Sequence, residues 1–143
     1  MHLLQRLFNS PPAPDTKAVM DKRGRKYWIV WDDDAEAPRV YLWCYGRVIG
    51  QAKLLWIYPD LQLGDINIFS PEHRRRGIGS ALLQEVIAYA RRKNAQTISG
   101  WIADHDAETN PNLFDWYRRY GFQIVFERDG ISVAKVRLDL ARN

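Results

Sequence analysis

The sequence lacks the features that mark several large classes of protein. Its only cysteine is Cys44, which excludes a disulfide within the chain and predicts a reducing compartment, so the cytoplasm is the expected location. No run of about 18 apolar residues is present, and no membrane-spanning helix is predicted. Histidine is scarce: His2, His73 and His105 do not have the spacing of a zinc site, and no metal is expected.

The composition is that of a globular protein of single-domain size. The 143 residues are 46% hydrophobic and 27% charged, which supplies enough apolar material for one core. The net charge of +4 and the six tryptophans are compatible with nucleic-acid binding, because aromatic side chains among basic ones can stack on bases. However, the arginines cluster in one loop and two helical segments, and most tryptophans lie in apolar, strand-like runs. Nucleic acid and membranes are therefore not the expected partners.

Two parts of the chain differ in composition. Residues 1–25 contain a short amphipathic cluster and then a proline-rich connector at residues 10–14, and we expect an N-terminal appendage there. The apolar residues of the cluster are Leu3, Leu4, Leu7 and Phe8. Residues 26–143 alternate between strand-like runs and two helical patterns, which predicts a single α+β domain.

The predicted order of elements is four strands, a helix, a strand, a second helix and two strands. Strands are predicted at residues 27–31, 40–45, 48–58, 63–69, 97–102, 122–128 and 131–140. Helices are predicted at 77–93 and 113–120, with a polar loop at 104–112. Asp129-Gly130 is a strong hairpin signal between the last two strands, and Gly121 is expected to end the second helix.

The most informative segment joins the fourth strand to the first helix. Residues 70–80 read Ser-Pro-Glu-His-Arg-Arg-Arg-Gly-Ile-Gly-Ser, a basic loop with two glycines. The apolar residues at helical spacing are Ile78, Leu82, Leu83, Val86, Ile87 and Ala90. A strand that leads through such a loop into a helix directs the unpaired N–H groups and the positive dipole end of the helix toward the loop. A diphosphate is the ligand that suits this geometry, and a solvated basic turn is the alternative.

The glycine pattern of this loop is not one of the two commonest phosphate motifs. A Walker loop is absent, and the dinucleotide fingerprint would need a third glycine or alanine that the chain lacks. Arg74-x-x-Gly77-x-Gly79 instead resembles the coenzyme A loop of the GNAT superfamily of acyl-CoA-dependent N-acetyltransferases, whose fuller form is Pro-x-x-Arg/Gln-Gly-x-Gly-x-Gly. Pro71 also matches this form, whereas Arg75 replaces its first glycine.

A second segment resembles the C-terminal signature of the same family, Asn-x-x-Ala-x-x-Phe/Leu-Tyr-x-x-x-Gly-Phe. The matching residues are Asn110, Trp116, Tyr117, Gly121 and Phe122, and Leu113 replaces the alanine. An aromatic helix face followed by a glycine cap is the structural alternative. The order of elements and the C-terminal hairpin also resemble the family, so that the resemblance spans residues 39–140.

The resemblance implies a fold and a cofactor. The fold is a single mixed, mostly antiparallel twisted sheet of about seven strands with flanking helices, and acetyl-CoA is the implied cosubstrate. The implied cofactor-binding residues are Phe69, Ser70, Pro71, Arg74, Arg75, Arg76, Gly77, Ile78, Gly79, Ser80 and Asn110. The backbone around Phe69 would polarise the thioester carbonyl. Glu72 and His73 are expected to be solvated loop residues, and Asn110 either binds the pantetheine arm or caps the second helix.

The resemblance also implies catalytic groups. Tyr117 is the implied proton donor to the departing thiolate, since a phenol with a pKa of about 10 stays protonated at neutral pH. Tyr120, three residues later, lies on the same helix face and is a rival for that role. Asp65 shares its strand face with Asn67 and Phe69 and is the candidate base; the alternative is a solvent-facing carboxylate.

The sequence therefore predicts an N-acetyltransferase that moves an acetyl group to a primary amine by direct attack in a ternary complex. One departure counts against efficient catalysis: the family usually carries two helices between its first two strands, and here only residues 32–38 separate them. An acyl-CoA-binding sensor or interaction module is thus the alternative. A homodimer, in which residues 1–10 pack near the acceptor side, would cover the open region and the apolar cluster.

Overall fold

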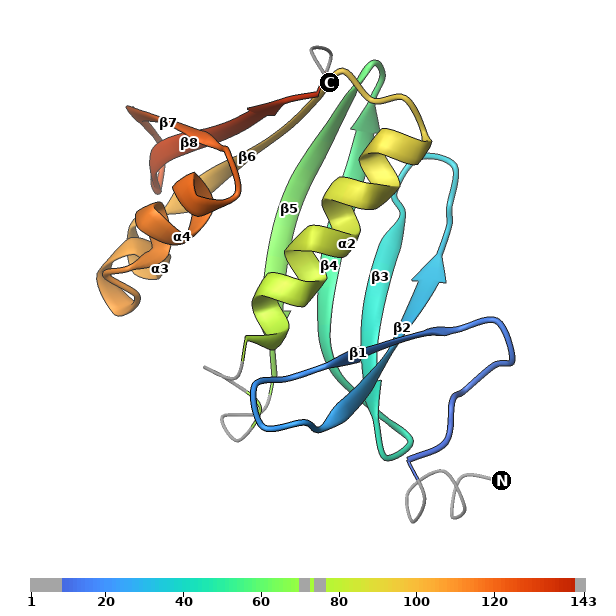
Figure 1. Ribbon diagram of the computed structural model, residues 1–143. Coiled ribbons are helices and arrows are strands. Elements are labelled where there is room, and N and C mark those ends of the chain that lie inside the picture. The colour runs from blue at the N-terminus through green and yellow to red at the C-terminus, as the bar shows by residue number, and fades with distance from the viewer. Residues whose placement is uncertain (1–8, 70–72, 74–76, 141–143) are drawn as a thin grey trace. The chain divides into compact units, whose positions relative to one another are not determined.

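The computed structural model describes residues 9–69, 73 and 77–140, and these form one hydrogen-bonded sheet with helices beside it (Figure 1). The strands are β1 (Lys17–Met20), β2 (Lys26–Asp32), β3 (Arg39–Cys44), β4 (Arg47–Ile57), β5 (Asp60–Ile68), β6 (Thr97–Ala103), β7 (Gln123–Asp129) and β8 (Ser132–Asp139). The helices are α2 (Ile78–Arg92), α3 (Asp104–Thr109) and α4 (Leu113–Arg119). The strand order is β1-β2-β3-β4-β5-β6-β8-β7, and β5 pairs with β6 in parallel.

The predicted mixed, mostly antiparallel sheet is confirmed, but it has eight strands instead of about seven. The additional strand is β1, which lies in the segment expected to be an appendage and pairs with β2. Its four residues show no alternation of buried and exposed side chains, so no periodicity indicated it. The prediction of a polar loop at 104–112 is wrong for the residues that form α3. No residue of α3 is buried, so the helix leaves no apolar stripe in the sequence.

The chain divides into two compact units. The first comprises residues 1–54 and 65–86, and the second comprises residues 55–64 and 87–143. β4, β5 and α2 each contribute residues to both units. The predicted boundary between an appendage and a domain at residue 25 stays a prediction.

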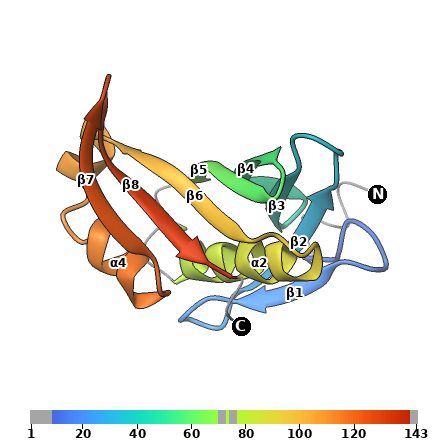
Figure 2. The ribbon, with the colours of Figure 1, turned by 90° about the horizontal axis from the view of Figure 1, so that it is seen from above.

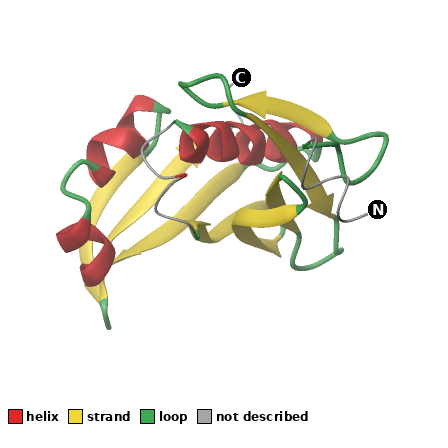
Figure 3. Ribbon diagram, turned by 90° about the horizontal axis from the view of Figure 1, so that it is seen from below, coloured by secondary structure: helices red, strands yellow, loops and turns green. Residues whose placement is uncertain are grey.

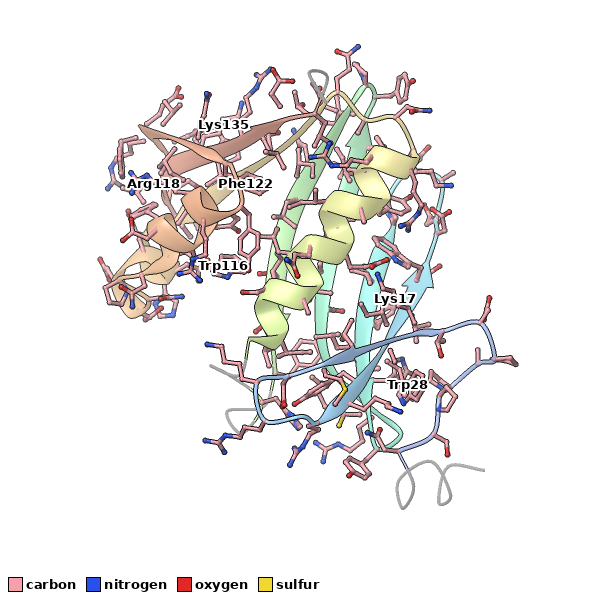
Figure 4. All side chains as sticks on the ribbon, viewed as in Figure 1. Lys17, Trp28, Trp116, Arg118, Phe122 and Lys135 are labelled. Carbon is pink, nitrogen blue, oxygen red and sulfur yellow. The ribbon has the colours of Figure 1, made fainter. Side chains whose placement is uncertain are left out.

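The core of the first unit lies between its strands and the start of α2. Its buried apolar side chains include Tyr27, Ile29, Val40, Leu42, Ile49, Ala52, Ile78, Leu82, Leu83 and Val86. The helical residues among them are those predicted from their spacing, so the predicted amphipathic helix is confirmed. Glu85 is also buried on α2. One of its carboxylate oxygens accepts a hydrogen bond from Trp31 Nε1 at 3.0 Å, and the other pairs with Lys17 Nζ at 3.1 Å (Figure 4).

The second unit contains the parallel pair and the C-terminal hairpin. Leu61 of β5 stands opposite Ile98 of β6, and Thr97 Oγ1 donates a hydrogen bond to Asp60 Oδ1 at 2.5 Å. The predicted hairpin is confirmed, because β7 and β8 pair around a turn in which Gly130 has φ +61°. Figure 2 shows α4 beside β7, and Figure 3 distinguishes the helices (red) from the strands (yellow). Among the described residues, no helix has the length and apolarity needed to cross a membrane.

Candidate functional site

The junction where the chain enters α2 has a backbone conformation that favours glycine. Gly77 adopts φ +82°, a conformation that L side chains rarely take, and α2 begins at the next residue, Ile78. The carbonyl of Gly77 accepts the N–H of Ala81 at 3.2 Å, so the helix forms directly from this glycine. No acidic residue lies in the first turn of α2. The positive end of the helix is therefore not neutralised by a carboxylate of its own first turn.

The two glycines of the loop have different surroundings. A Cβ placed on Gly77 would meet the side chain of Lys22 at 3.3 Å, whereas a Cβ on Gly79 would meet no atom of the described residues within 4 Å. Gly77 is therefore required by the backbone, but Gly79 leaves open space beside the first turn of α2. An anionic group can approach the helical N–H groups closely at such a position.

Several predicted cofactor residues lie outside the described residues: Ser70, Pro71, Arg74, Arg75 and Arg76. Phe69 is described, and its ring is 44% exposed at the end of β5. Its N–H donates to the carbonyl oxygen of Ile49 at 2.8 Å. Because this donor is already used within the sheet, a thioester carbonyl would have to be polarised by a different amide.

His73 departs from its predicted environment. It was expected to be solvated, but its side chain is only 5% exposed, so that prediction is wrong. Its Nδ1 lies 2.8 Å from the hydroxyl oxygen of Tyr27, and the two rings meet edge to face with centroids 5.5 Å apart. Glu72, the other residue expected to be solvated, lies outside the described residues.

Asp65 lies on β5 with the side-chain alternation that the sequence predicted. Asp65, Asn67 and Phe69 are all exposed, as residues two apart on one face of a strand should be. The carboxylate of Asp65 makes no hydrogen bond to another described residue. It is therefore accessible, as a base must be, and equally fits the solvent-facing alternative.

In the second unit, Tyr117 is the buried member of an aromatic group at α4. Its side chain is 9% exposed, and its ring contacts Trp116 at 4.9 Å and Phe122 at 5.3 Å between centroids. Tyr120 is half-buried and lies 6.1 Å from Trp116. Figure 4 labels Trp116 and Phe122 in this group. Gly121, with φ +92°, follows the last turn of α4, which confirms the predicted helix end.

Asn110 does not cap the helix that carries Tyr117. The N-cap residue of α4 is Asn112, whereas Asn110 is the C-cap of α3, where its N–H donates to Asp106. The capping alternative for Asn110 is therefore wrong. Its side chain is exposed, and contact with the pantetheine arm stays a prediction.

The described site residues fall into both units. Asp65, Phe69, Gly77 and Gly79 belong to the first, and Tyr117 and Asn110 to the second, with Tyr120. Sequence reasoning missed the turn between β1 and β2, which carries Asp21 and Lys22. The signal that could have found it is Asp-Lys-Arg-Gly at residues 21–24, a turn-type sequence between two short strands. Among the described residues, no group of three or more His, Cys, Asp or Glu side chains could hold a metal ion.

Comparison with known proteins found many structural relatives. The PaiA N-acetyltransferase from Thermoplasma acidophilum, in complex with coenzyme A, aligns with a TM-score of 0.61 and 18% identity; the alignment covers 73% of this chain and 61% of that chain. The GNAT domain of S. lividans PAT aligns with a TM-score of 0.73 and 13% identity, over 90% of this chain and 99% of that one.

A third relative is the ribosomal-protein-S18-alanine N-acetyltransferase from Escherichia coli, with a TM-score of 0.63, 19% identity, and coverage of 76% of this chain and 72% of that chain. A comparison with curated proteins gave no match. The structural likeness establishes the fold. The sequence model of the acetyltransferase (GNAT) family matches residues 2–122, and the chain therefore belongs to the acetyltransferase (GNAT) family.

Proposed function

We propose that this protein is an acetyl-CoA-dependent N-acetyltransferase that acetylates a primary amine, with the cytoplasm as its setting. The observation that carries the proposal is the start of α2, where Gly77 turns the chain at φ +82° and Gly79 leaves the first helical turn open. A diphosphate can approach such a helix N-terminus, where the N–H groups and the dipole favour negative charge. The S18-alanine enzyme among the structural relatives acts on an amine, which supports the acceptor class.

The cofactor would lie along the end of β5 and the start of α2. The proposed pyrophosphate ligands are the backbone amides of Arg74, Arg75, Arg76, Gly77, Ile78, Gly79 and Ser80. Phe69, Ser70 and Pro71 would follow the pantetheine arm, and Asn110 would hydrogen-bond to it. Arginine side chains in this loop add fixed positive charge, since a guanidinium stays protonated at all physiological pH values.

The proposed reaction is a direct transfer. The nitrogen of a neutral amine attacks the thioester carbonyl carbon, the C–S bond breaks as the tetrahedral intermediate collapses, and the acetyl group becomes an amide. Asp65, directly or through water, accepts the proton that the amine loses. Tyr117 donates a proton to the thiolate of coenzyme A, with Tyr120 as the alternative donor. No covalent enzyme intermediate is needed.

A second function, acyl-CoA binding without efficient catalysis, is favoured by one observation. Only residues 33–38 connect β2 to β3, and within the described residues no helix precedes α2. The part of the family fold that shapes the acceptor site is therefore reduced. A sensor or interaction module would keep the cofactor site and lose the acceptor pocket.

The test is an acetyl-transfer assay with a panel of primary amines that includes small polyamines and the N-termini of short peptides. A transferase releases one thiol for each acetylated amine, and both products can be measured. Background thiol release without any acetylated amine, together with tight acetyl-CoA binding, would favour the sensor. A Tyr120→Phe variant with lower turnover than Tyr117→Phe would move the acid role to Tyr120.

We further propose a homodimer that involves residues 1–10. The described part of this segment is tied to its own chain: the side chain of Asn9 donates to the carbonyl of Lys26 at 2.7 Å and accepts the N–H of Tyr45 at 2.8 Å. The connector therefore does not carry Asn9 away from the first unit. Sedimentation of the full chain and of a chain that begins at Asn9 tests the dimer; equal association states would refute the role of Leu3, Leu4, Leu7 and Phe8.

A further inference from the structure

Three buried polar side chains from separate segments form one hydrogen-bonded chain. Asp21 is 7% exposed and lies in the turn between β1 and β2, Tyr27 is fully buried on β2, and His73 is 5% exposed and lies between β5 and α2. The Tyr27 hydroxyl is 3.0 Å from Asp21 Oδ2 and 2.8 Å from His73 Nδ1. All three residues belong to the first unit. Burial of so many polar groups is costly unless they are bonded, so the arrangement has to be specific.

The direction of each hydrogen bond follows from the chemistry of the groups. Asp21 Oδ1 accepts the backbone N–H groups of Arg23 and Arg25, each at 2.9 Å, and Oδ2 accepts the Tyr27 hydroxyl. Because the phenol proton is donated to the carboxylate, the Tyr27 oxygen accepts from Nδ1–H of His73. Burial, and next the hydrogen bond to Asp21, raise the pKa of Tyr27 to about 12, so this proton stays in place at neutral pH.

The same turn makes a second contact at the start of α2. Lys22 of this turn packs beside Gly77, since a Cβ added to Gly77 would lie 3.3 Å from the aliphatic side chain of Lys22. In Figure 1 the turn between β1 and β2 lies beside the first residues of α2. Two described residues between β5 and α2 are thus held in place, His73 by hydrogen bonds and Gly77 by packing.

We infer that the turn between β1 and β2 positions the cofactor site, and that Tyr27 acts as a positioning residue through His73. The inference rests on the proposed function, since it concerns the binding of coenzyme A at the start of α2. Backbone that is held in place at His73 and Gly77 before binding loses less conformational freedom at these residues when the ligand arrives. Removal of the Tyr27 hydroxyl should therefore weaken cofactor binding without touching the reacting atoms.

The competing explanation is that these three residues only stabilise the fold. The two explanations differ in what they predict for folded protein. A purely structural role lowers the melting temperature and leaves the affinity of the folded molecules unchanged. A positioning role raises the Kd for coenzyme A and the KM for acetyl-CoA, while kcat at saturating acetyl-CoA stays nearly constant.

The experiment measures coenzyme A binding by calorimetry, well below the melting temperature, for the parent and for Tyr27→Phe. The matched control is Tyr41→Phe on β3, because Tyr41 is half-buried and its hydroxyl bonds no described residue. We expect Tyr27→Phe to weaken coenzyme A binding about five- to tenfold, which corresponds to the loss of one net hydrogen bond or somewhat more. Tyr41→Phe should bind coenzyme A like the parent. The KM for acetyl-CoA should rise by a similar factor, with kcat changed less than about twofold.

A second pair of variants keeps the inference falsifiable if Tyr27→Phe is too unstable to measure. His73→Asn retains a donor near the position of Nδ1, whereas His73→Leu removes it. The inference predicts that His73→Asn binds coenzyme A more tightly than His73→Leu. Equal affinities for this pair, or a Tyr27→Phe affinity equal to that of the parent, overturn the inference alone. A folded parent that does not bind coenzyme A overturns the proposed function and the inference with it.

Discussion

The open space beside Gly79 allows a substitution that should change stability and cofactor affinity in opposite directions. Gly79 is the second residue of α2, and a Cβ there meets no atom within 4 Å in the part of the chain that the structure describes. Gly79→Glu can therefore be accommodated by the fold, but it places a negative charge where we propose the diphosphate. We expect a more stable protein that binds acetyl-CoA less tightly.

The gain in stability has two sources. Replacement of glycine within a helix stabilises it by roughly 0.5–1 kcal/mol, because glycine loses the most backbone freedom on folding. A glutamate near a helix N-terminus adds about 0.3–1 kcal/mol, and the first turn of α2 has no acidic residue yet. The total of about 1–2 kcal/mol corresponds to a rise in melting temperature of roughly 3–7 °C for a chain of this size.

The loss of affinity follows from Coulomb repulsion. Two negative charges about 5 Å apart repel by about 1–3 kcal/mol when the effective dielectric constant lies between roughly 20 and 80. This range corresponds to a Kd increased about five- to 150-fold. Added salt should reduce the increase, because ions screen exposed charges over about 8 Å at physiological ionic strength.

Calorimetric titration with acetyl-CoA measures the affinity, and thermal unfolding without ligand measures the stability. Gly79→Gln is the matched control, since it has the same size and helix propensity without the charge. The reasoning is refuted if Gly79→Glu and Gly79→Gln bind acetyl-CoA equally tightly. If Gly79→Glu unfolds at a lower temperature than the parent, the space beside Gly79 is not open.

Three further predictions concern single side chains. Tyr117→Phe should lower kcat about ten- to a thousandfold with little change in cofactor affinity, as expected for loss of a general acid; an unchanged kcat would exclude Tyr117 as the acid. Glu85→Ala should destabilise the protein by about 2–4 kcal/mol in urea unfolding, because the half-buried Trp31 indole loses the carboxylate that accepts its N–H and a cavity forms at the buried Glu85 position. Glu85→Gln should cost less, and Lys17→Ala, which removes an exposed partner, should cost at most about 1 kcal/mol. The pKa of Tyr27 is raised from 10.0 to about 12, so the stabilisation that the protonated Tyr27 hydroxyl provides is complete below pH 10 and is lost as the pH rises through about 12. The difference in tyrosinate absorbance between the parent and Tyr27→Phe should therefore appear only near pH 12, and a midpoint at about pH 10 would refute the buried hydrogen bond.

The parts of the fold with strong periodicity could be predicted from the sequence. The apolar stripe of α2 and the Asp-Gly turn of the C-terminal hairpin each produce a regular local pattern, and both are confirmed. β1 could not be predicted, because its four residues obtain their place by pairing with β2 and not from an alternation of their own. α3 was missed for a related reason, since a short helix without a buried residue has no apolar face to recognise.

Gly77 lies where the sequence predicted, at the entry to α2, and its role in cofactor binding stays a prediction. Its positive φ there is a conformation that favours glycine. The burial of His73 could not be predicted, since it depends on Tyr27, which lies 46 residues earlier in the chain. A long-range contact of this kind leaves no spacing in the sequence to read. The same holds for Asn110, whose place at the end of α3 required knowledge that α3 exists.

The binding of acetyl-CoA to the folded parent protein is the measurement that tests the account most directly. Calorimetric titration should show one site per chain, and coenzyme A should bind the same site more weakly. Because such a ligand binds only the native state, saturating acetyl-CoA should also raise the melting temperature, by the equivalent of about 2.7 kcal/mol at a concentration 100 times the Kd. The absence of binding heat at millimolar acetyl-CoA, in a sample that unfolds cooperatively, would contradict the proposed cofactor site.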